Sequence, residues 1–323
     1  MHMIDYQYLK EITTNQKDTC MHDLYVIYRK VKRCVRSVTK EYLDFSENVE
    51  FYPNAPKMSD LEIISLAITA ECLSIDSENL LFSKLKKDYS KQFPNLIHRT
   101  RYNVRRKRLN EWILYCADIW SQRIKDDNAL FIVDSIPIAV CKICRAPRST
   151  ICRKDSDEVK AAHGFDSTIR QWFCGYRLHL IVSTSGVYQE MRLLPANRHD
   201  LDFLKEMKQT HLEKCCLIGD KAYRSQPLQM SLFEDWGIDL SVPYRSNQKD
   251  YVEYPYHLKI ERKRIETVFS QYCDDLMLKR NYAKSYFGLE SRIRTKIAAM
   301  TFKQYWNYIN GNKISRTKHA LVA

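Results

Sequence analysis

Glycine and proline are scarce in this sequence, with 7 and 9 residues among 323. Linkers and disordered segments are usually rich in one or both, so we expect the chain to fold over most of its length. The sequence also lacks any run approaching the roughly 18 uninterrupted apolar residues of a membrane span. Residues 1–8 carry early charge and have no apolar stretch of the signal-peptide type. We therefore expect a cytoplasmic protein without a membrane partner.

Acidic residues are in deficit, and the cysteines lack a regular pattern. Lys and Arg total 52 against 39 Asp and Glu, which gives a net charge of +13 and a pI of about 9.1. Such a surplus favours a polyanionic partner, most often nucleic acid, because neutralising phosphates releases counterions. A generally basic, soluble surface is the simpler alternative. The 11 cysteines are scattered and odd in number, which favours reduced thiols over a disulfide framework.

The first part of the chain, residues 1–125, is predicted to be a helical domain. Ser59 can cap a helix whose Glu62 reaches back to it, and further helices are expected over residues 78–89 and from Thr100. The last of these begins in a segment, residues 98–108, with six Arg or Lys. We predict that this helix binds DNA phosphates, and a solvated helix face is the alternative. The arginines concerned are Arg99, Arg101, Arg105, Arg106 and Arg108.

Residues 126–310 change to alternating strands and helices, and residues 311–323 form a basic C-terminal tail. The apolar run 129–133 predicts a buried strand ending at Asp134, and the run 215–219 predicts another ending at Asp220. Between and after them we expect a hairpin over 173–184 and 187–194, a strand over 238–242 and helices over 200–212, 258–272 and 288–308. This order predicts an α/β domain with a mixed sheet flanked by helices.

Three carboxylates of this second domain are the candidate catalytic residues. Asp134 and Asp220 each follow an apolar strand, where an acidic residue is costly to bury unless it binds something. Glu266 lies on the helix predicted over 258–272, beside the apolar residues expected to face the sheet. Such a cluster suits two Mg²⁺ or Mn²⁺ ions about 4 Å apart, which clamp the attacking and leaving oxygens of a phosphoryl transfer. We expect Asp134 to bridge both ions.

Six short motifs resemble those of bacterial insertion-sequence DDE transposases. The three that match the catalytic blocks are Val133-Asp134-Ser135-Ile136-Pro137, Gly219-Asp220-Lys221-Ala222-Tyr223 and Arg262-Lys263-Arg264-Ile265-Glu266-Thr267. The others are Gly175-Tyr176-Arg177-Leu178-His179, Pro195-Ala196-Asn197-Arg198-His199-Asp200 and Pro243-Tyr244-Arg245-Ser246-Asn247. The resemblance covers roughly residues 55–300. The N-terminal part is similar to that of a compact subgroup of this family, whose N-terminal part is helical. All motifs occur in order and at matching spacing.

The resemblance implies an RNase H-like catalytic domain that cuts DNA at the inverted-repeat ends of a mobile element and transfers the strands to target DNA. It assigns the two-metal site to Asp134, Asp220 and Glu266, and implies a homodimer on DNA in the bacterial cytoplasm, at the nucleoid. We also expect Arg262, Lys263 and Lys221 to contact DNA. Many relatives carry a Tyr and a Lys near the Glu, where this chain has Lys259 and Cys273.

Two other functions remain open at this point, a metal-dependent nuclease that cuts without joining and a DNA-binding repressor with a decayed catalytic domain. Smaller questions also have two answers. The Cys141, Cys144, Cys152 and His163 set, expected in a loop after the first strand, is either a zinc site or free thiols. Asp200 is either a helix N-cap or a residue near the metals. Trp172 either stacks on a base or packs at the protein rim.

Overall fold

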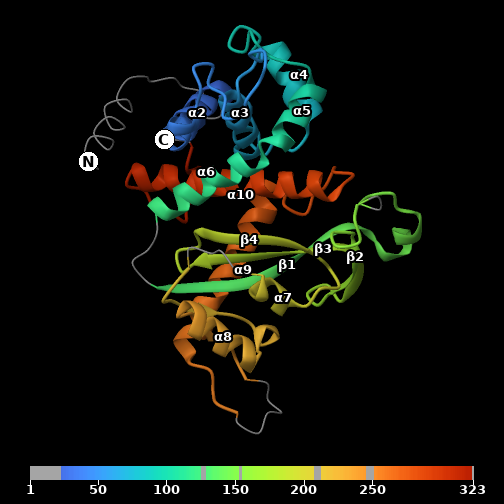
Figure 1. Ribbon diagram of the computed structural model, residues 1–323, viewed down its shortest axis with the longest axis vertical. Helices are drawn as coiled ribbons and strands as arrows, with labels where there is room; N and C mark the ends of the chain where they lie inside the picture. Colours follow the sequence, from blue (N-terminus) through green and yellow to red (C-terminus); the bar gives the residue numbers. More distant parts are fainter. Residues whose placement is uncertain (1–22, 125–128, 153–154, 207–211, 245–250, 322–323) are drawn as a thin grey trace.

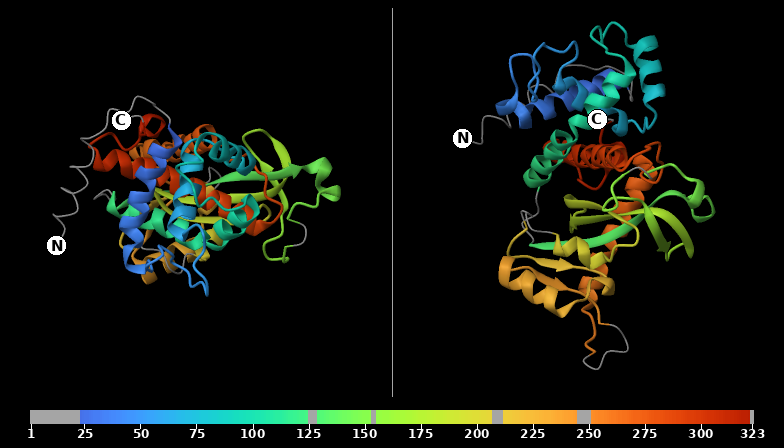
Figure 2. Two further views of the ribbon diagram at one scale, coloured as in Figure 1. Left: turned by 90° about the horizontal axis from the view of Figure 1, so that it is seen from above. Right: turned by 45° about the vertical axis from the view of Figure 1, so that its right-hand side comes forward.

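The computed structural model describes residues 23–124, 129–152, 155–206, 212–244 and 251–321. A layer of helices lies over a mixed sheet, and one long helix runs between them (Figure 1). The same layering is visible after the molecule is turned (Figure 2). Within the described ranges, no helix is both long enough and apolar enough to cross a membrane.

The N-terminal region is helical, as predicted. It comprises α2 (Leu24–Thr39), η1 (Lys40–Tyr42), α3 (Asp60–Cys72), α4 (Glu78–Asp88), α5 (Arg99–Arg108) and α6 (Asn110–Arg123). The predicted capping box is present, because the Ser59 hydroxyl accepts from the Glu62 amide and the Glu62 carboxylate accepts from the Ser59 amide. The helix expected to continue through Leu109 is instead divided there into α5 and α6.

The long helix α10 (Tyr286–Ile309) completes the helical layer although it comes late in the sequence. It packs chiefly against α6 and α3, and nearly every residue from Ile293 to Asn307 is buried. The Lys296 ammonium lies in this interface and donates to the Glu71 carboxylate and to the Leu276 carbonyl. A single apolar core therefore joins the two halves of the chain.

The sheet contains β1 (Leu130–Lys142), β2 (Ala162–Asp166), β3 (Gln171–Ser183), β4 (Tyr188–Pro195), β5 (Cys216–Ile218) and β6 (Asp239–Ser241). Its order is β2-β3-β1-β5-β6, and β4 pairs with β3 beside β2. The β1–β3 pair is antiparallel, as is the predicted β3–β4 hairpin, whereas β5 is parallel to both β1 and β6. The sheet is thus mixed, as predicted.

Helices cover both faces of the sheet. α9 (Tyr256–Leu276) packs against β1 and buries Ile265, Val268 and Phe269 in the core shared with the helical layer. On the opposite face a second core contains side chains from α7 (Asp200–Lys205) and α8 (Gln226–Trp236). This arrangement confirms the predicted fold class, a mixed sheet flanked by helices and preceded by a helical region.

Two predictions about this sheet were wrong. β1 does not end at Asp134 but pairs with β3 as far as Lys142. Beyond Asp134 its other neighbour, β5, has ended, so β1 is an edge strand there and tolerates Pro137, which has no amide to donate. The segment with the four candidate zinc ligands is also not one loop, because Cys141 lies in β1 and His163 in β2. The helix predicted over 200–212 ends earlier, at Lys205 of α7 with Glu206 as its C-cap, and residues 207–211 lie outside the described ranges.

Candidate active site

Asp134 and Asp220 extend from neighbouring strands at the same level of the sheet. In the parallel β1–β5 pair, Ile132 lies opposite Ile218; Asp134 lies two residues further along β1, and Asp220 two residues after Ile218, just beyond the end of β5. Gly219, which precedes Asp220, packs closely against the sheet, because a Cβ at that position would lie 3.2 Å from the side chains of Val133 and Val242. The parallel register therefore brings the two predicted carboxylates to one edge of the sheet.

The Asp134 carboxylate is largely buried and only partly compensated. Its side chain is 26% exposed, its Oδ1 accepts from the Ser135 amide at 2.8 Å, and its Oδ2 lies 3.8 Å from an Arg262 guanidinium nitrogen. Burial raises the pKa of Asp134 to about 6, an effect opposed by the Ser135 amide and Arg262 and increased by the charges of Asp220 and Asp200. Such a carboxylate has spare capacity for a cation.

Asp220 begins the short helix η3 (Lys221–Tyr223) and caps it with its own side chain. The Oδ1 atom accepts from the Lys221 amide at 2.6 Å, and the Asp220 carbonyl accepts from the Tyr223 amide at 2.9 Å. The Lys221 side chain is exposed. Asp220 thus has a local structural role as the cap of this turn. Its second carboxylate oxygen accepts no hydrogen bond from the described residues.

Glu266 comes from α9, and its position follows from helix phase as predicted. Its neighbour Ile265 is fully buried against the sheet, whereas the Glu266 side chain is 62% exposed. Arg262, one turn earlier, lies with one guanidinium nitrogen 3.8 Å from Glu266 Oε1 and another 3.8 Å from Asp134 Oδ2. The guanidinium group therefore separates the two carboxylates and supplies the positive charge between them. Lys263 is exposed on the same helix.

Contacts at the turn between β3 and β4 hold α9 in this position. The Arg264 guanidinium donates to the Ser185 carbonyl at 2.8 Å. Gly186 has φ +83°, and a Cβ there would lie 2.9 Å from both Arg264 and Val268. A side chain at this turn would push the helix away from the sheet, so the glycine required by the turn also sets the distance between Glu266 and β1.

A polar network beside Asp134 was not predicted as a unit. Side chains alternate along β1, so Asp134 faces α9 while Ser135 faces α7, where its hydroxyl donates to Asp200 Oδ1 at 3.2 Å. Asp200 is not the N-cap of α7. His199 has that role, accepting from the Leu201 amide at 3.1 Å. Its motif was noted in the sequence, but only the structure places Asp200 at the site.

His179 and Tyr223 complete this network from β3 and η3. The His179 ring is fully buried, and its Nδ1 lies 3.2 Å from the Tyr223 hydroxyl. Burial, followed by the charge of Arg177, lowers the pKa of His179 to about 3. The imidazole is therefore neutral near pH 7, so its 3.9 Å approach to Asp200 is not an ion pair. His179 therefore adds no positive charge beside Asp200 and Asp134.

The site has carboxylate oxygens of the kind that Mg²⁺ and Mn²⁺ prefer. In the described parts of the chain, however, no three His, Cys, Asp or Glu side chains lie close enough together to hold an ion. The Arg262 guanidinium between Asp134 and Glu266 accounts for part of this separation, since it already balances their charge. The residues fit divalent ions in donor type, and Arg262 is the cation that such ions would displace.

Among the described residues, the candidate zinc ligands do not form a group of three that could hold a metal ion. Cys141 lies opposite Cys174 in the β1–β3 pair, whereas Cys144 is exposed on η2 (Ile143–Arg148). Cys152 is buried and its amide donates to the Lys284 carbonyl. Trp172 is an exposed residue that packs against Phe165, with ring centroids 5.5 Å apart. These positions leave Cys141 and Cys144 as separate free thiols.

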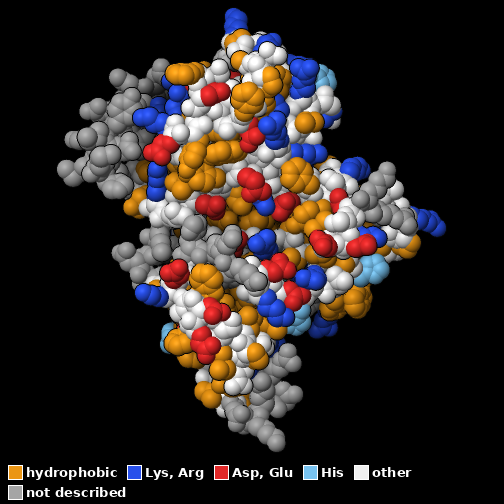
Figure 3. All heavy atoms as spheres, in the orientation of Figure 1, with side chains coloured by type: hydrophobic (Ala, Val, Ile, Leu, Met, Phe, Trp, Pro, Cys, Tyr) orange, Lys and Arg blue, Asp and Glu red, His pale blue; other side chains and the backbone are white. Residues whose placement is uncertain are grey.

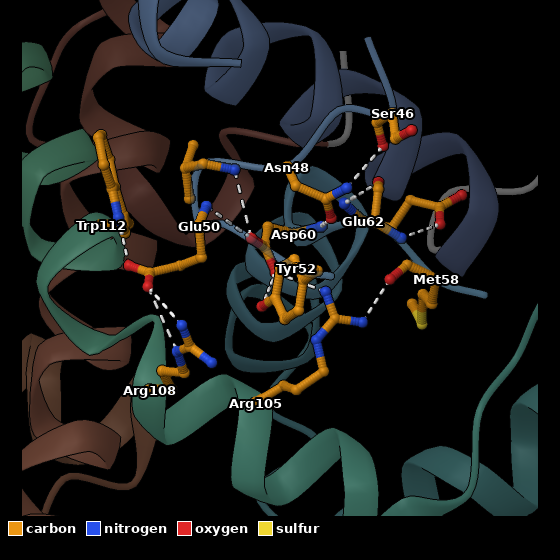
Figure 4. A network of polar contacts seen from close by, with 12 residues as sticks. Ser46, Asn48, Glu50, Tyr52, Met58, Asp60, Glu62, Arg105, Arg108 and Trp112 are labelled. Atoms are coloured by element: carbon orange, nitrogen blue, oxygen red, sulfur yellow. Dashed lines mark hydrogen bonds and ion pairs between the residues drawn. The ribbon is translucent and has the colours of Figure 1, made fainter. Parts of the chain in front are cut away.

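The predicted DNA-binding arginines of α5 divide into two groups. Arg105 binds the Met58 carbonyl and the fully buried Asp60, which also accepts from the hydroxyl of Tyr52 (Figure 4). Arg108 binds Glu50 on the same side of the helix. Arg105 thus secures the segment before α3, whereas the Arg108 side chain is 52% exposed.

The remaining arginines face the start of α4. The Arg106 side chain is only 6% exposed, and its Nε lies 3.3 Å from Glu78. Arg99 lies 3.9 Å from the same carboxylate, and Arg101 is exposed. Of the five predicted arginines, Arg99, Arg101 and Arg108 therefore keep the most exposed side chains.

A comparison with sequence models of protein families finds a match in the part of the chain that contains the sheet and α9. The sequence model of the family described as Transposase DDE domain matches residues 125–281. Residues 125–281 are therefore similar to a transposase DDE domain. The match extends from β1 to the end of α9 and so includes all three candidate carboxylates. The mixed sheet with its flanking helices agrees with the RNase H-like fold expected of such a domain. No curated protein and no solved structure matches the chain.

A transposase DDE domain implies DNA as the substrate, and this family generally uses divalent metal ions. The surplus of positive charge agrees with such a substrate. Acidic and basic side chains lie next to each other over α7 and the adjoining sheet in the middle of Figure 3.

Proposed function

We propose that this transposase domain cleaves DNA at the ends of a bacterial insertion sequence and joins the released 3′ ends to target DNA, using two Mg²⁺ or Mn²⁺ ions. The observation that supports this most is the pairing of β1 with β5, which presents Asp134 and Asp220 at one level of the sheet. Glu266 is the proposed third ligand, opposite them on α9.

Each residue has a proposed task. Asp134 is central, because it lies between the charges of Asp220 and the Arg262–Glu266 pair, and it is the proposed bridging ligand. The bound ions would supply Lewis-acid activation of a water or a DNA 3′-hydroxyl. Arg262, released from the carboxylates, would bind a DNA phosphate, and Lys263 and Lys221, whose side chains are exposed, have the same proposed role.

Each part of the chain has a proposed role in this reaction. The helical region, residues 1–125, would bind DNA, residues 126–310 would form the catalytic domain, and residues 311–323 would form a basic tail. Joining two ends of an element requires two active sites or one site used twice, and a homodimer on DNA provides the former. We place this complex in the bacterial cytoplasm, at the nucleoid.

Cleavage and strand transfer provide the test. A labelled duplex carrying the DNA that flanks the coding sequence is incubated with the full chain, Mg²⁺ and a target plasmid. We expect strand-specific nicks and plasmid-joined products from the wild type, and a loss of both from Asp134→Ala, Asp220→Ala and Glu266→Ala. Asp157→Ala, which removes a carboxylate whose side chain is 98% exposed, serves as the control and should retain both products.

The alternatives give different results in the same assay. Nicks without joined products would indicate a nuclease. DNA binding without any metal-dependent cleavage would indicate a repressor. Full activity in all three alanine variants would contradict the proposed carboxylate site itself.

A further inference from the structure

A basic cleft opens where the helical layer meets the start of α10. Its volume is about 400 Å³. One wall comes from the beginning of α4 and from α5, and the other comes from the segment that leads into α10. Figure 1 shows α5 above the end of α10 at which that segment enters, and Figure 3 shows basic side chains over α4 and α5. The lining residues that carry charge are Glu78, Arg99, Arg106, Lys107, Lys284 and Arg292.

The cleft has more positive charge than its own acidic residue can balance. Five of the six charged lining residues are cations. The one carboxylate, Glu78, is already shared, since Arg106 lies 3.3 Å from it, Arg99 lies 3.9 Å from it, and the Asn103 amide donates to it at 2.8 Å. Like charges held together in a partly enclosed space raise the local potential for an anion.

Arg292 adds to this potential from the floor of the cleft. Its guanidinium donates to the Asp76 carbonyl at 3.0 Å and lies 5.5 Å from the centre of the Tyr282 ring. Burial, followed by the charge of Arg106, lowers the pKa of Arg292, and the charges of Glu71, Glu78 and Asp76 oppose this effect. A negatively charged ligand would add to the charges that already stabilise this guanidinium.

Lys107 and Lys284 stand on opposite walls. Among the described residues, neither ammonium group has an acidic partner within ion-pair distance. The end of the Lys107 side chain lies beside the first turn of α10, since a Cβ at Gly288 would be 3.6 Å from its Cε. Lys284 is exposed. Both lysines are therefore available to a ligand that enters the cleft from solvent.

We propose that the basic cleft binds the phosphates of a DNA backbone and is a DNA contact separate from the carboxylate site. This inference rests on the proposed function for its ligand. The chemistry favours phosphates, because five of the six charged residues that line the cleft are cations. Backbone contacts of this kind position DNA without selecting its sequence.

The cleft joins the two halves of the chain. The Lys284 carbonyl accepts from the Cys152 amide at 2.9 Å, and the Tyr286 hydroxyl donates to the Leu193 carbonyl at 3.0 Å. One wall is thus fastened to the DDE domain and the other belongs to α5. DNA bound in the cleft would contact both walls. Its position relative to the sheet that carries Asp134 would therefore be fixed by the protein core.

The test is a binding measurement that needs no catalysis. Fluorescence anisotropy follows a labelled duplex with the full-length Lys107→Gln/Lys284→Gln variant in EDTA over a range of salt concentrations. Lys40→Gln/Lys313→Gln removes the same charge from two exposed lysines elsewhere and is the matched control. Each lost phosphate contact lowers the slope of log K against log salt by about 0.9, so we expect the cleft variant to lose about 2. The control should keep the wild-type slope.

Equal slopes for the wild type and the cleft variant would overturn the inference, as would equal losses in both double variants, because the effect would then be one of net charge. Circular dichroism melting verifies that each variant is folded. If the wild type binds no DNA, the proposed function fails together with the inference. If the wild type binds and cleaves DNA and the cleft variant has the same salt slope as the wild type, the inference alone fails.

Discussion

Replacing Asp134 by Asn should stabilise the metal-free protein, and should do so more at neutral pH than in acid. The carboxylate is largely buried, and its pKa is raised from 3.8 to about 6, chiefly by burial. The folded protein therefore binds the Asp134 proton more tightly than the unfolded chain does. The wild type must then lose stability as the pH rises through the range between these two values.

The magnitude follows from the two pKa values. The wild type pays about 3 kcal/mol at pH 7 for holding Asp134 ionised, about half of that at pH 5, and almost nothing below pH 4. Asparagine keeps the shape and accepts from the Ser135 amide but carries no charge. The free-energy difference between variant and wild type should therefore grow by about 1.4 kcal/mol from pH 5 to pH 7.

Urea denaturation in EDTA at pH 5, 6 and 7 measures this difference. Asp157→Asn is the control, because its side chain is 98% exposed, and its difference from wild type should not change with pH. Added Mg²⁺ should stabilise the wild type and not Asp134→Asn, so their order of stability should reverse at sufficient metal. A stability difference that is constant from pH 5 to pH 7 would refute the claim that burial of this charge is costly.

Two further predictions concern arginine contacts. Arg262→Gln should lower the Mn²⁺ concentration needed for half-maximal thermal stabilisation, because the guanidinium that competes with the ion beside Asp134 is removed, while DNA cleavage falls; a higher Mn²⁺ requirement would contradict this. Asp60→Ala should destabilise the protein by about 3–5 kcal/mol in urea, because it leaves the largely buried Arg105 without its partner. Arg108→Ala, which breaks an exposed contact nearby, should leave the urea midpoint unchanged, and similar losses in both variants would count against the buried pair.

Local sequence patterns were enough to predict the elements that carry the site. Apolar runs of strand length located β1 and β5, and the parallel register of these strands places Asp134 and Asp220 at the same level of the sheet. Helix phase placed Glu266 beside a buried Ile265. These predictions depend on short stretches of chain, whose periodicity shows in the sequence.

The remaining features depend on partners far away in the sequence. β1 continues past Asp134 because β3 pairs with it there, and no local signal reveals that pairing. Arg105 and Arg106 belong to a segment that looks solvated, yet Asp60 and Glu78 turn them inward. The same applies to Asp200, whose role beside Ser135 exists only because α7 packs near β1. Charge pattern alone could not distinguish an arginine that binds DNA from one that binds its own chain.

The late helix α10 has a consequence for how the protein is made. Translation produces α2 to α6 first, but the apolar faces of α3 and α6 lack their native partner until residues 286–309 have left the ribosome. One wall of the basic cleft comes from that same late segment. We therefore expect a nascent or prematurely terminated chain to hold DNA poorly even though it contains the arginines of α5. Incomplete copies would then not compete with finished transposase for the same DNA.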